Sequence, residues 1–415
     1  MFVKAILALF LTALLFILGS SVLAQVQTSR TYSREDFINI DGNNLQDKID
    51  RAIKQFKDSR QGDSLWIAYH FPAREGSYIS PFSGFVYHDE DGIRLTRREN
   101  LEGAAVFLLA DVSGSRPAFT RVKTLNLNDP YLFENRPVYW LGNVDAAQSL
   151  AQLETIMRAD PENKPLIRSA LRAISSHNSP RVIPLLKEIA LKDSSYDIQR
   201  AAISSLGRVP AKESHDALDE IFNTTKSISL KQEIVRAYTY AGDRVSEKRV
   251  LDRLTAIAKS DDSYEVRREA IHRIASFRGD AVVDRLFDIY DRINDREVKI
   301  EIIRRVTVRG GRDDSVMKRL TAIARRDTDL GIQREAMRRI AAVRGDEGID
   351  ALIEIYDSSN SDAIKEEIIG HLGRSQSRKA LDKLLSIAKN DQSPRLRQSA
   401  IRRLSTHRGS GLSLQ

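Results

Sequence analysis

The sequence of 415 residues contains no cysteine. Disulfides, thiolate nucleophiles, cysteine-ligated zinc, iron–sulfur clusters and c-type haem attachment are therefore excluded. Histidine is also scarce, with seven residues in the whole chain. Neither a His-Glu-x-x-His motif nor a phosphate loop is found, and Gly-x-Ser-x-Gly and a helix-opening Gly-x-Gly-x-x-Gly are also missing. We therefore expect a protein that is not an enzyme, with no catalytic residues, no cofactor and no metal site.

Composition indicates a folded protein with an uneven charge distribution. Hydrophobic residues make up 41% of the chain and charged residues 29%, which is typical of folded domains. The length allows two or three domains. The formal net charge is +8. Residues 301–415 hold 23 Lys/Arg and 16 Asp/Glu, so the positive excess belongs to the C-terminal quarter.

The N-terminus carries a long apolar run. Lys4 precedes the run, which starts at Ala5, and Val22 and Ala24 occupy the small-residue positions of an export cleavage site. This pattern predicts a signal peptide over residues 1–24, cleavage after Ala24, and a mature chain in a bacterial periplasm or secreted. The alternative is an uncleaved anchor, because residues 5–24 nearly reach the length of about 20 residues that spans a bilayer. Only in that case is the membrane an expected partner.

From residue 143 onward the sequence repeats. In eight places an apolar helix closes on isoleucine followed by alanine, methionine or an aromatic residue, at spacings of 32 to 36 residues. Periods of this length are the signature of repeat architectures. The isoleucines are Ile156, Ile189, Ile221, Ile257, Ile289, Ile323, Ile355 and Ile387.

Each repeat has two helical halves. In the last repeat Leu381, Leu384, Leu385 and Ala388 follow the i, i+3, i+4, i+7 pattern of an amphipathic helix, and the apolar positions of residues 396–404 form a second one. Glycines in the turns after the second halves, such as those in "FRGD" and "VRGG", predict helix C-caps. One helix pair cannot bury its apolar stripe alone, so we expect the pairs to stack.

The repeats alternate between two types. In one type an aspartate follows the closing pair by three residues, and in the other type the pair ends in Phe222, Tyr290 or Tyr356. A second period of about 66 residues is therefore superimposed on the first. The aspartates are Asp160, Asp193, Asp261, Asp327 and Asp391.

The segments Asp261–Ala270 and Asp391–Ala400 follow the pattern D-x-x-x-x-V/L-R-x-x-A, and with the eight copies they resemble HEAT repeats. The resemblance implies a mainly α fold: a right-handed α-solenoid of about eight two-helix repeats over residues 143–408. We expect residues 409–415 to form a disordered tail. It also implies a ladder of aspartates and arginines that joins successive repeats. The ladder residues are Asp193, Asp261, Arg267, Asp327, Asp391 and Arg397.

Two features depart from that family's patterns. Arg200 and Arg334 lie one position later than the ladder arginine should, so no ladder contact is assigned to them. HEAT-like di-iron hydroxylases carry His-Glu dipeptides on several repeats, whereas no histidine in this chain precedes a glutamate. The resemblance therefore implies the fold without that enzyme activity.

Residues 25–142 lack the repeat and resemble no family that we identify. A charged helix is predicted near Leu45–Lys57, and strands are predicted at residues 64–71, 104–111 and 119–127, separated by Gly/Pro/Ser/Asp clusters. We expect a small α+β domain that contacts the first repeat through residues 136–142. The remaining enzymatic alternative is a metal or catalytic site in this domain, built from His70, His88 and acidic residues.

Two groups of residues contain side-chain types that bind metal ions. Glu269 and His272 stand three residues apart, but equivalent repeats place Ser204, Arg338 or Arg402 at the position of His272. We interpret both as outward positions, with i,i+4 ion pairs Glu269–Arg273, Glu301–Arg305 and Glu335–Arg339. The second cluster is "YHDEDG" at residues 87–92. It has too few alternating oxygen ligands for calcium, and a hairpin turn at Asp-Gly explains it more simply.

Arginines recur near the ends of the second helices. Equivalent positions of a solenoid align, so these side chains could form one cationic row, which we name the arginine stripe. A solvated face partly neutralised by glutamates is the simpler alternative. The stripe comprises Arg273, Arg304, Arg305, Arg338, Arg339, Arg402 and Arg403, and Arg172 and Arg236 hold similar positions.

The sequence thus predicts an exported, non-catalytic scaffold that binds a protein partner through the concave surface of the solenoid. The arginine stripe would favour an acidic partner or an anionic envelope polymer. The alternative is a polyanion or nucleic-acid binder that uses the same stripe. The export signal and the scarcity of aromatic residues between the arginines argue against nucleic acid.

Overall fold

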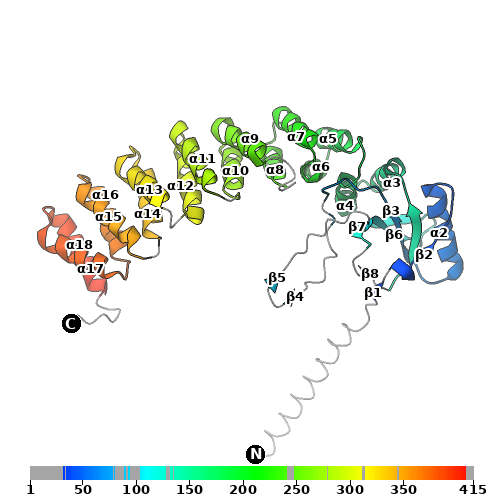
Figure 1. Cartoon of the computed structure of the whole chain (residues 1–415), viewed down its shortest axis with the longest axis horizontal. Helices are drawn as coiled ribbons and strands as arrows, with labels where there is room; N and C mark the ends of the chain where they lie inside the picture. Colours follow the sequence, from blue (N-terminus) through cyan, green and yellow to red (C-terminus); the bar gives the residue numbers. More distant parts are fainter. Residues whose placement is uncertain are drawn as a thin grey trace, which may run out of the picture. The chain divides into compact units, whose positions relative to one another are not determined.

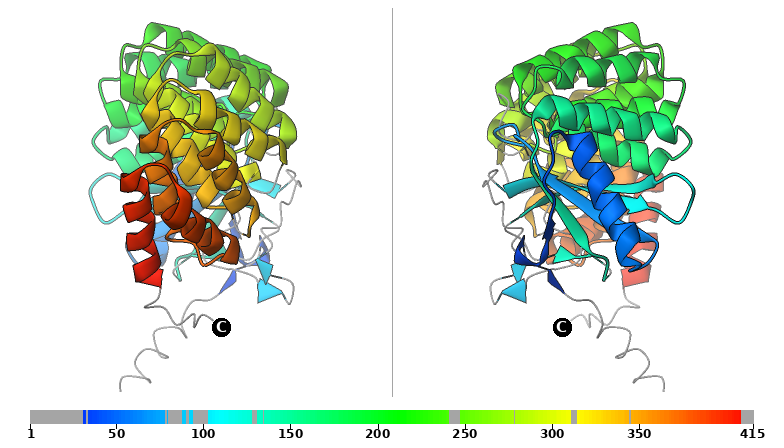
Figure 2. Two further views of the ribbon diagram at one scale, coloured as in Figure 1. Left: turned by 90° about the vertical axis from the view of Figure 1, so that its left-hand side faces the viewer. Right: turned by 90° about the vertical axis from the view of Figure 1, so that its right-hand side faces the viewer.

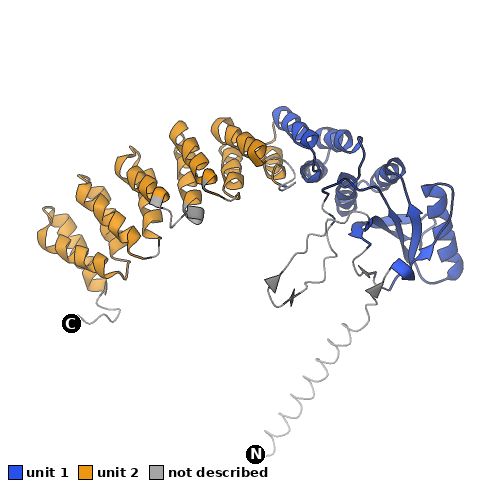
Figure 3. Ribbon diagram, in the orientation of Figure 1, with its two compact units in different colours: residues 1–225, 240–245 blue, residues 226–239, 246–415 orange. Residues whose placement is uncertain are grey.

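The computed structural model describes residues 31–407, except 33, 78, 80–87, 90–91, 94–102, 128–130, 134, 241–246, 278, 311–313 and 344. The predicted signal peptide (residues 1–24) and the predicted tail (residues 409–415) lie outside these residues. The chain forms two compact units. Unit 1 comprises residues 1–225 and 240–245, and unit 2 comprises residues 226–239 and 246–415 (Figure 3).

Unit 1 begins with a five-stranded mixed sheet in the order β2-β9-β3-β6-β7 (Figure 1). The strands are β2 (Ile38–Asn39), β3 (Ser64–His70), β6 (Ala104–Asp111), β7 (Ala118–Asn126) and β9 (Val138–Asn143). β9 pairs in parallel with β2 and β3, whereas β3–β6 and β6–β7 are antiparallel. Two short antiparallel pairs complete the strands: β1 (Thr31–Tyr32) with β8 (Tyr131–Leu132), and β4 (His88–Asp89) with β5 (Gly92–Ile93).

The strands β3, β6 and β9 are buried on both faces, which explains the nearly continuous apolar runs of β3 and β6, whereas part of β7 is exposed. Helix α2 (Leu45–Ser59) contacts β3 and β9 with an apolar stripe that includes Ile49, Ile53 and Phe56. The other side holds an aromatic cluster of Phe37, Trp66, Phe107, Phe133 and Trp140. The predicted helix and the three predicted strands of this region are confirmed, and a one-turn 3-10 helix, η1 (Arg34–Asp36), precedes them.

The sheet is joined to the first repeat by a buried polar chain within unit 1. The hydroxyls of Tyr69 and Ser149 lie 3.0 Å apart, and the Ser149 hydroxyl is 2.7 Å from Nε2 of His177. His177 Nδ1 is 2.8 Å from the Ala173 carbonyl oxygen, and its ring stacks on Phe71 with centroids 4.0 Å apart. Burial lowers the pKa of His177 to about 4, so the imidazole is neutral at neutral pH.

The sequence placed this joint at residues 136–142, but most of that segment forms β9. Val138, Tyr139, Trp140 and Leu141 are buried within the sheet between β2 and β3. Polar contacts with the first repeat come instead from β3 and the segment after it, where Arg74 donates its backbone N–H to Ser176 and Pro72 accepts from Asn178. The edge strand β7 also packs against α4, whereas β9 lies inside the sheet between β2 and β3.

The described residues that follow form eight consecutive helix pairs. Each pair has a first helix and a second helix joined by a short turn, as the repeat predicted. The pairs are α3 (Ala146–Ala159) with α4 (Lys164–Ser175), α5 (Val182–Lys192) with α6 (Tyr196–Arg208), α7 (Lys212–Thr224) with α8 (Ile228–Ala237), α9 (Glu247–Ser260) with α10 (Tyr264–Ile274), α11 (Asp280–Arg292) with α12 (Arg296–Gly310), α13 (Asp314–Arg326) with α14 (Leu330–Ala341), α15 (Glu347–Ser358) with α16 (Asp362–Leu372), and α17 (Arg378–Asn390) with α18 (Pro394–His407).

In unit 2 the helices stack in two layers. Each second helix from α8 to α18 contacts the next second helix, and first helices contact first helices, as in α13 with α15 and α15 with α17. Val266, Ala270, Ile271 and Ile274 of α10 are buried, as predicted. Figure 2 shows successive helix pairs lying one behind another along the array. The predicted α-solenoid, preceded by a small sheet-containing domain, is confirmed.

The C-cap role predicted for the turn glycines is confirmed at Gly373, the C-cap of α16, and is wrong for the turns after α10 and α14. Helices α10 and α14 end on alanine caps in right-handed conformation, Ala275 and Ala342. Gly279 and Gly345 take positive φ values of 109° and 94° just before α11 and α15 begin. The left-handed residue is needed where the chain turns into the next first helix, and glycine adopts it without steric cost.

Within the described part of the chain, no helix combines the length and the apolar character needed to cross a bilayer.

Candidate functional site

The arginine stripe lies on the second helices of unit 2, where each predicted i,i+4 ion pair is present. Arg273 contacts Glu269 at 2.8 Å, Arg305 contacts Glu301 at 2.7 Å, and Arg339 contacts Glu335 at 2.7 Å. The guanidinium groups follow their carboxylates by one helical turn, the spacing that brings side chains together on a helix.

The expectation that these glutamates are outward positions is wrong. The side chains of Glu301 and Glu335 are only 3% and 4% exposed, and Glu269 is 12% exposed. Each is covered by an arginine of the preceding repeat, since Arg236 reaches Glu269 at 3.3 Å and Arg304 reaches Glu335 at 3.5 Å. The pairs therefore bridge repeats as well as helix turns. His272 is exposed, as expected.

Desolvation pushes the pKa of Glu269 upward, but hydrogen bonds and charges from Arg236 and Arg273 outweigh it, and the net pKa lies below its ordinary value. The carboxylate is thus ionised at neutral pH. Among the residues that the structure describes, no group of three His, Asp or Glu side chains is arranged to hold a metal ion.

Arginines outnumber carboxylates in the middle of the stripe. Arg268, Arg304 and Arg305 lie within 3.9 Å of Glu301. Arg304, Arg338 and Arg339 lie within 3.5 Å of Glu335. Five guanidinium groups thus share two buried carboxylates, and the face keeps a net positive charge. The side chain of Arg338 is 61% exposed and that of Arg304 is 45% exposed, so both remain open to a partner.

The last repeat changes the pattern. Ser399 takes the place of the glutamate and donates its hydroxyl to Glu366 at 2.5 Å. Arg402 and Arg403 are exposed, and no carboxylate in the described part of the chain lies within ion-pair distance of either. These two arginines are therefore the least neutralised part of the stripe.

The ladder residues join repeats through partners that the sequence did not predict. Asp261 accepts from Lys231 of the preceding second helix at 2.9 Å, and Arg267 donates to Asp295 of the following repeat at 2.8 Å. Arg397 donates to the backbone carbonyl of Asp391 at 2.8 Å rather than to a carboxylate. The predicted aspartates thus do not pair with the predicted arginines, but arginine–aspartate contacts do join successive repeats, at Arg267–Asp295 and at Arg296–Asp329, where the atoms are 3.2 Å apart. Arg334 lies 3.5 Å from Glu367 of the next repeat.

Tyrosine hydroxyls complete the linkage in two places. Tyr290 donates to Asp327 at 2.6 Å, and Tyr356 donates to Asp391 at 2.7 Å. Burial, together with the adjacent carboxylates, raises the pKa of both phenols. These bonds explain the 66-residue period, because a repeat ending in tyrosine precedes a repeat that carries the aspartate. The alternation in the sequence was the signal, but it does not reveal that the two side chains meet.

The "YHDEDG" segment forms the β4–β5 pair, with His88 opposite Ile93 and Asp89 opposite Gly92. A hairpin was predicted here with its turn at Asp91-Gly92, but Gly92 lies in β5 opposite Asp89, so the turn falls one residue earlier than predicted. The two connecting residues, Glu90 and Asp91, are not among the described residues, and the structure does not describe the side chain of His88. The proposed site of His70, His88 and acidic residues therefore stays a prediction.

Solved structures that resemble the chain share a low sequence identity. Human deoxyhypusine hydroxylase in complex with glycerol is 15% identical, with a TM-score of 0.26, and the match covers 54% of this chain and 83% of that one. Kap95p, in a structure on the switch loops of RanGDP, is 12% identical, with a TM-score of 0.37 and coverage of 61% and 38%. The chain thus spans about two fifths of Kap95p. The CpcE–CpcF complex of phycocyanin lyase from Nostoc sp. PCC7120 is 13% identical, with a TM-score of 0.26 and coverage of 66% and 98%.

No curated protein sequence matches the chain. The family described as HEAT repeats matches in two segments, residues 150–239 and 317–405. These segments fall within the helix pairs described above. Over these two segments the chain therefore consists of HEAT repeats.

Proposed function

We propose that this protein is an exported, non-catalytic scaffold that binds an acidic protein partner through the second-helix face of its array, which would be the concave surface. The observation that carries the proposal is the excess of arginine over carboxylate on this face. Glu301 and Glu335 hold five guanidinium groups between them, and Arg402 and Arg403 have no carboxylate partner in the described chain.

The arrangement suits recognition of carboxylates. A guanidinium presents a rigid fork of N–H donors that matches a carboxylate with two hydrogen bonds. The buried glutamates hold the arginine stems in place, so less conformational freedom is lost when a partner binds. A row of like charges also attracts an oppositely charged partner over a distance and raises the association rate.

Charge reversal at the end of the stripe tests the proposal. In cells of the source organism, cross-linking followed by mass spectrometry identifies partners of the full chain and of the variant Arg402→Glu/Arg403→Glu. We expect recovery of the principal partner to fall about tenfold or more, because a hydrogen bond between charged groups contributes about 1.5–3 kcal/mol and 1.4 kcal/mol is tenfold in affinity.

The matched control is Arg378→Glu/Lys389→Glu, which makes the same charge change on α17, the first helix of the same repeat. Partner recovery should be unchanged in this control. Equal recovery by the wild type and the Arg402/Arg403 variant would exclude a role for the stripe. If the molecule lost is a polyanion, and its binding weakens steeply with salt, the alternative of polyanion binding is correct.

Export is tested separately by N-terminal sequencing of the protein from fractionated cells. A mature protein that begins at Gln25 outside the cytoplasm supports the signal peptide. A protein that retains residues 1–24 in the membrane fraction indicates the anchor, and a full-length protein in the cytoplasm contradicts export.

A further inference from the structure

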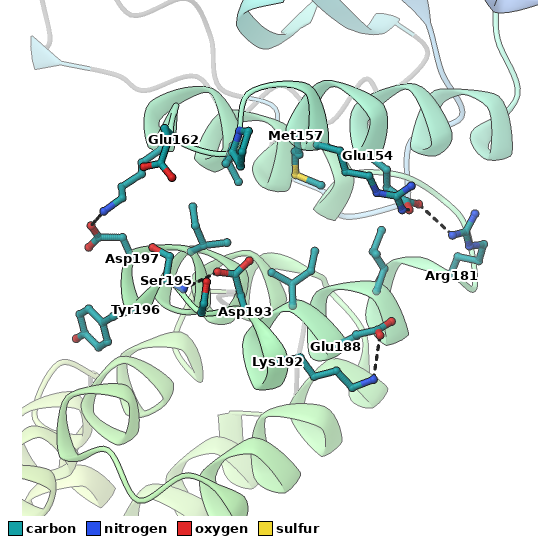
Figure 4. Close-up of a pocket in the computed structure, with 18 residues that line it drawn as sticks. Glu154, Met157, Glu162, Arg181, Glu188, Lys192, Asp193, Ser195, Tyr196 and Asp197 are labelled. Carbon is teal, nitrogen blue, oxygen red and sulfur yellow. Dashed lines mark hydrogen bonds and ion pairs between the residues drawn. The ribbon is translucent and has the colours of Figure 1, made fainter.

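A groove separates the first helices α3 and α5 in unit 1 (Figure 4). Several other neighbouring first helices contact one another directly, as α5 does with α7 and α15 does with α17. The groove has a volume of about 990 Å³. This volume matches about two turns of an α-helix, for a helix diameter of about 10 Å and a rise of 1.5 Å per residue.

The groove has an apolar lining between two charged ends. Met157, Ile167, Leu185, Ile189 and Ile198 contribute the apolar surface. At one end Lys164 pairs with Asp197 at 3.4 Å, and at the other end Arg181 pairs with Glu154 at 3.0 Å. Figure 4 shows Met157 and Asp193 between these two pairs. Tyr196, which also lines the groove, is 43% exposed.

Asp193 differs from the equivalent aspartates of later repeats. In each repeat the Oδ1 atom accepts the backbone N–H of the second residue on: Ser195 for Asp193 at 2.7 Å, and Ser393 for Asp391 at 2.9 Å. The Oδ2 atoms of Asp261, Asp327 and Asp391 accept from Lys231, Tyr290 and Tyr356. Within the part of the chain that the structure describes, no group donates to Oδ2 of Asp193.

The sequence explains why Asp193 lacks these partners. Met157 stands where the later repeats have Tyr290 and Tyr356. Ile167 stands four residues after the N-cap Asn163, the position of Lys231 after Ser227 and of Lys365 after Ser361. Lys365 lies 5.2 Å from the Tyr356 ring centre. Both the hydroxyl and the ammonium group that accompany the aspartate elsewhere are thus replaced by apolar side chains.

The uncompensated charge of the groove is negative. Glu154, Glu188 and Asp197 each have a cationic partner in the lining, namely Arg158 and Arg181, Lys192, and Lys164. For Glu162 and Asp193 the described residues provide no cation within ion-pair distance. A carboxylate set in an apolar surface attracts a cationic group that brings apolar neighbours, since both parts of such a ligand gain from binding.

We propose that the α3–α5 groove binds an amphipathic helix of a partner protein, with a lysine or arginine of that helix on Asp193 and its apolar face on Met157, Leu185 and Ile189. The helix would take the place that a neighbouring first helix occupies in the closed interfaces. A helix laid into an apolar groove is an established mode of peptide recognition. The proposal is independent of the arginine stripe, because the groove lies in unit 1 and selects the opposite charge.

Helical peptides displayed from a random library and selected on the purified full chain test this proposal. The variant Met157→Tyr/Ile167→Lys fills the groove with the side chains that later repeats carry. Peptides that also bind this variant are discarded, so that the remaining peptides are those that need the open groove. We expect the remaining sequences to combine an i, i+3, i+4, i+7 apolar pattern with a lysine or arginine.

The second variant, Asp193→Asn, keeps the shape of the groove and removes its charge. We expect it to weaken the selected peptides about tenfold or more, whereas the matched neutralisation Asp382→Asn on α17 leaves their affinity unchanged. Circular dichroism checks that each variant folds. A selection without binders sensitive to Met157→Tyr/Ile167→Lys, or one that yields acidic sequences, would overturn the proposal. If the chain self-associates and Met157→Tyr/Ile167→Lys abolishes that self-association, the groove binds a second copy of the chain. This result would also overturn the proposal.

Discussion

Asp193 and Asp391 hold the same position in their repeats, and their surroundings differ. Asp391 accepts the hydroxyl of Tyr356 and a backbone N–H, and in the described chain Asp193 accepts only the backbone N–H. The first interface has Met157 and Ile167 where the last one has Tyr356 and Lys365. The open groove therefore coincides with the loss of the two polar side chains that lie beside the aspartate in the last interface.

The comparison shows how a repeat array acquires specific sites. The backbone geometry of the aspartate turn is the same in both places, since each Oδ1 atom caps the same N–H. Specificity arises from the neighbouring repeat, which either satisfies the second oxygen or leaves it accessible. If the α3–α5 groove binds a partner as proposed, the unit of function is an interface between two repeats rather than a single repeat.

Acid should destabilise unit 1 more than unit 2, because burial lowers the pKa of His177 further than it lowers those of His272 and His371 in unit 2, and this is the largest effect that we expect. The ordinary pKa of histidine is about 6.5, and burial lowers that of His177 to about 4. As the pH falls, the imidazole of His177 is therefore protonated in the unfolded chain before it is protonated in the folded chain. The contribution of neutral His177 to the free energy of unfolding is complete above pH 6.5. It falls by roughly 3 kcal/mol as the pH decreases toward 4.

The measurement is urea unfolding at pH 7 and pH 4.5, followed by tryptophan fluorescence. Both tryptophans, Trp66 and Trp140, lie in the sheet of unit 1, so this signal reports unit 1, and circular dichroism at 222 nm reports mainly the helices. Acid should lower the fluorescence midpoint more than the dichroism midpoint. His177→Phe keeps the stack on Phe71 and should make the fluorescence midpoint less sensitive to pH. Equal shifts in both signals for the wild type would contradict the prediction.

Removal of the two aspartates sharpens the comparison. Asp391→Ala should lower the free energy of unfolding by about 2 kcal/mol, because the buried Tyr356 hydroxyl loses its acceptor. Asp193→Ala should cost only about 1 kcal/mol, since the structure provides one hydrogen bond to lose, from the Ser195 N–H. Urea unfolding followed by circular dichroism compares the two variants. Similar losses would show that Asp193 has a structural role.

The smallest expected change in the free energy of unfolding comes from removing the Tyr356 hydroxyl group. Tyr356→Phe should cost about 1 kcal/mol, the usual contribution of one hydrogen bond. In a double-mutant cycle with Asp391→Asn, the two losses should not add, because both changes break the same bond. Additive losses would mean that the Tyr356–Asp391 contact contributes nothing to stability.

Most of the fold could be predicted from the sequence. The isoleucine spacing identifies eight helix pairs, and the apolar stripe of α10 is buried as expected. The strands of residues 64–71 and 104–111 were also found, since their composition differs from that of the helices. Such predictions succeed because periodic burial leaves a periodic pattern.

The contacts between repeats could not be predicted in the same way. The i,i+4 spacing places Arg339 beside Glu335, but nothing in one repeat reveals that Arg304 of the preceding repeat covers the same carboxylate. The burial of Glu335 depends on the distance between helices. The groove beside Asp193 could not be predicted either, because Met157 and Ile167 look like ordinary apolar positions of a helix.

The tyrosine–aspartate bonds also determine which pieces of the array can be removed. Loss of one repeat would place two repeats of the same type next to each other, and a tyrosine or an aspartate would lose its partner. Excision of the four helices α13 to α16 would instead bring Tyr290 against Asp391 and restore the bond. Because each repeat depends on its neighbours for stability, the natural module for shortening or lengthening this array is a pair of repeats.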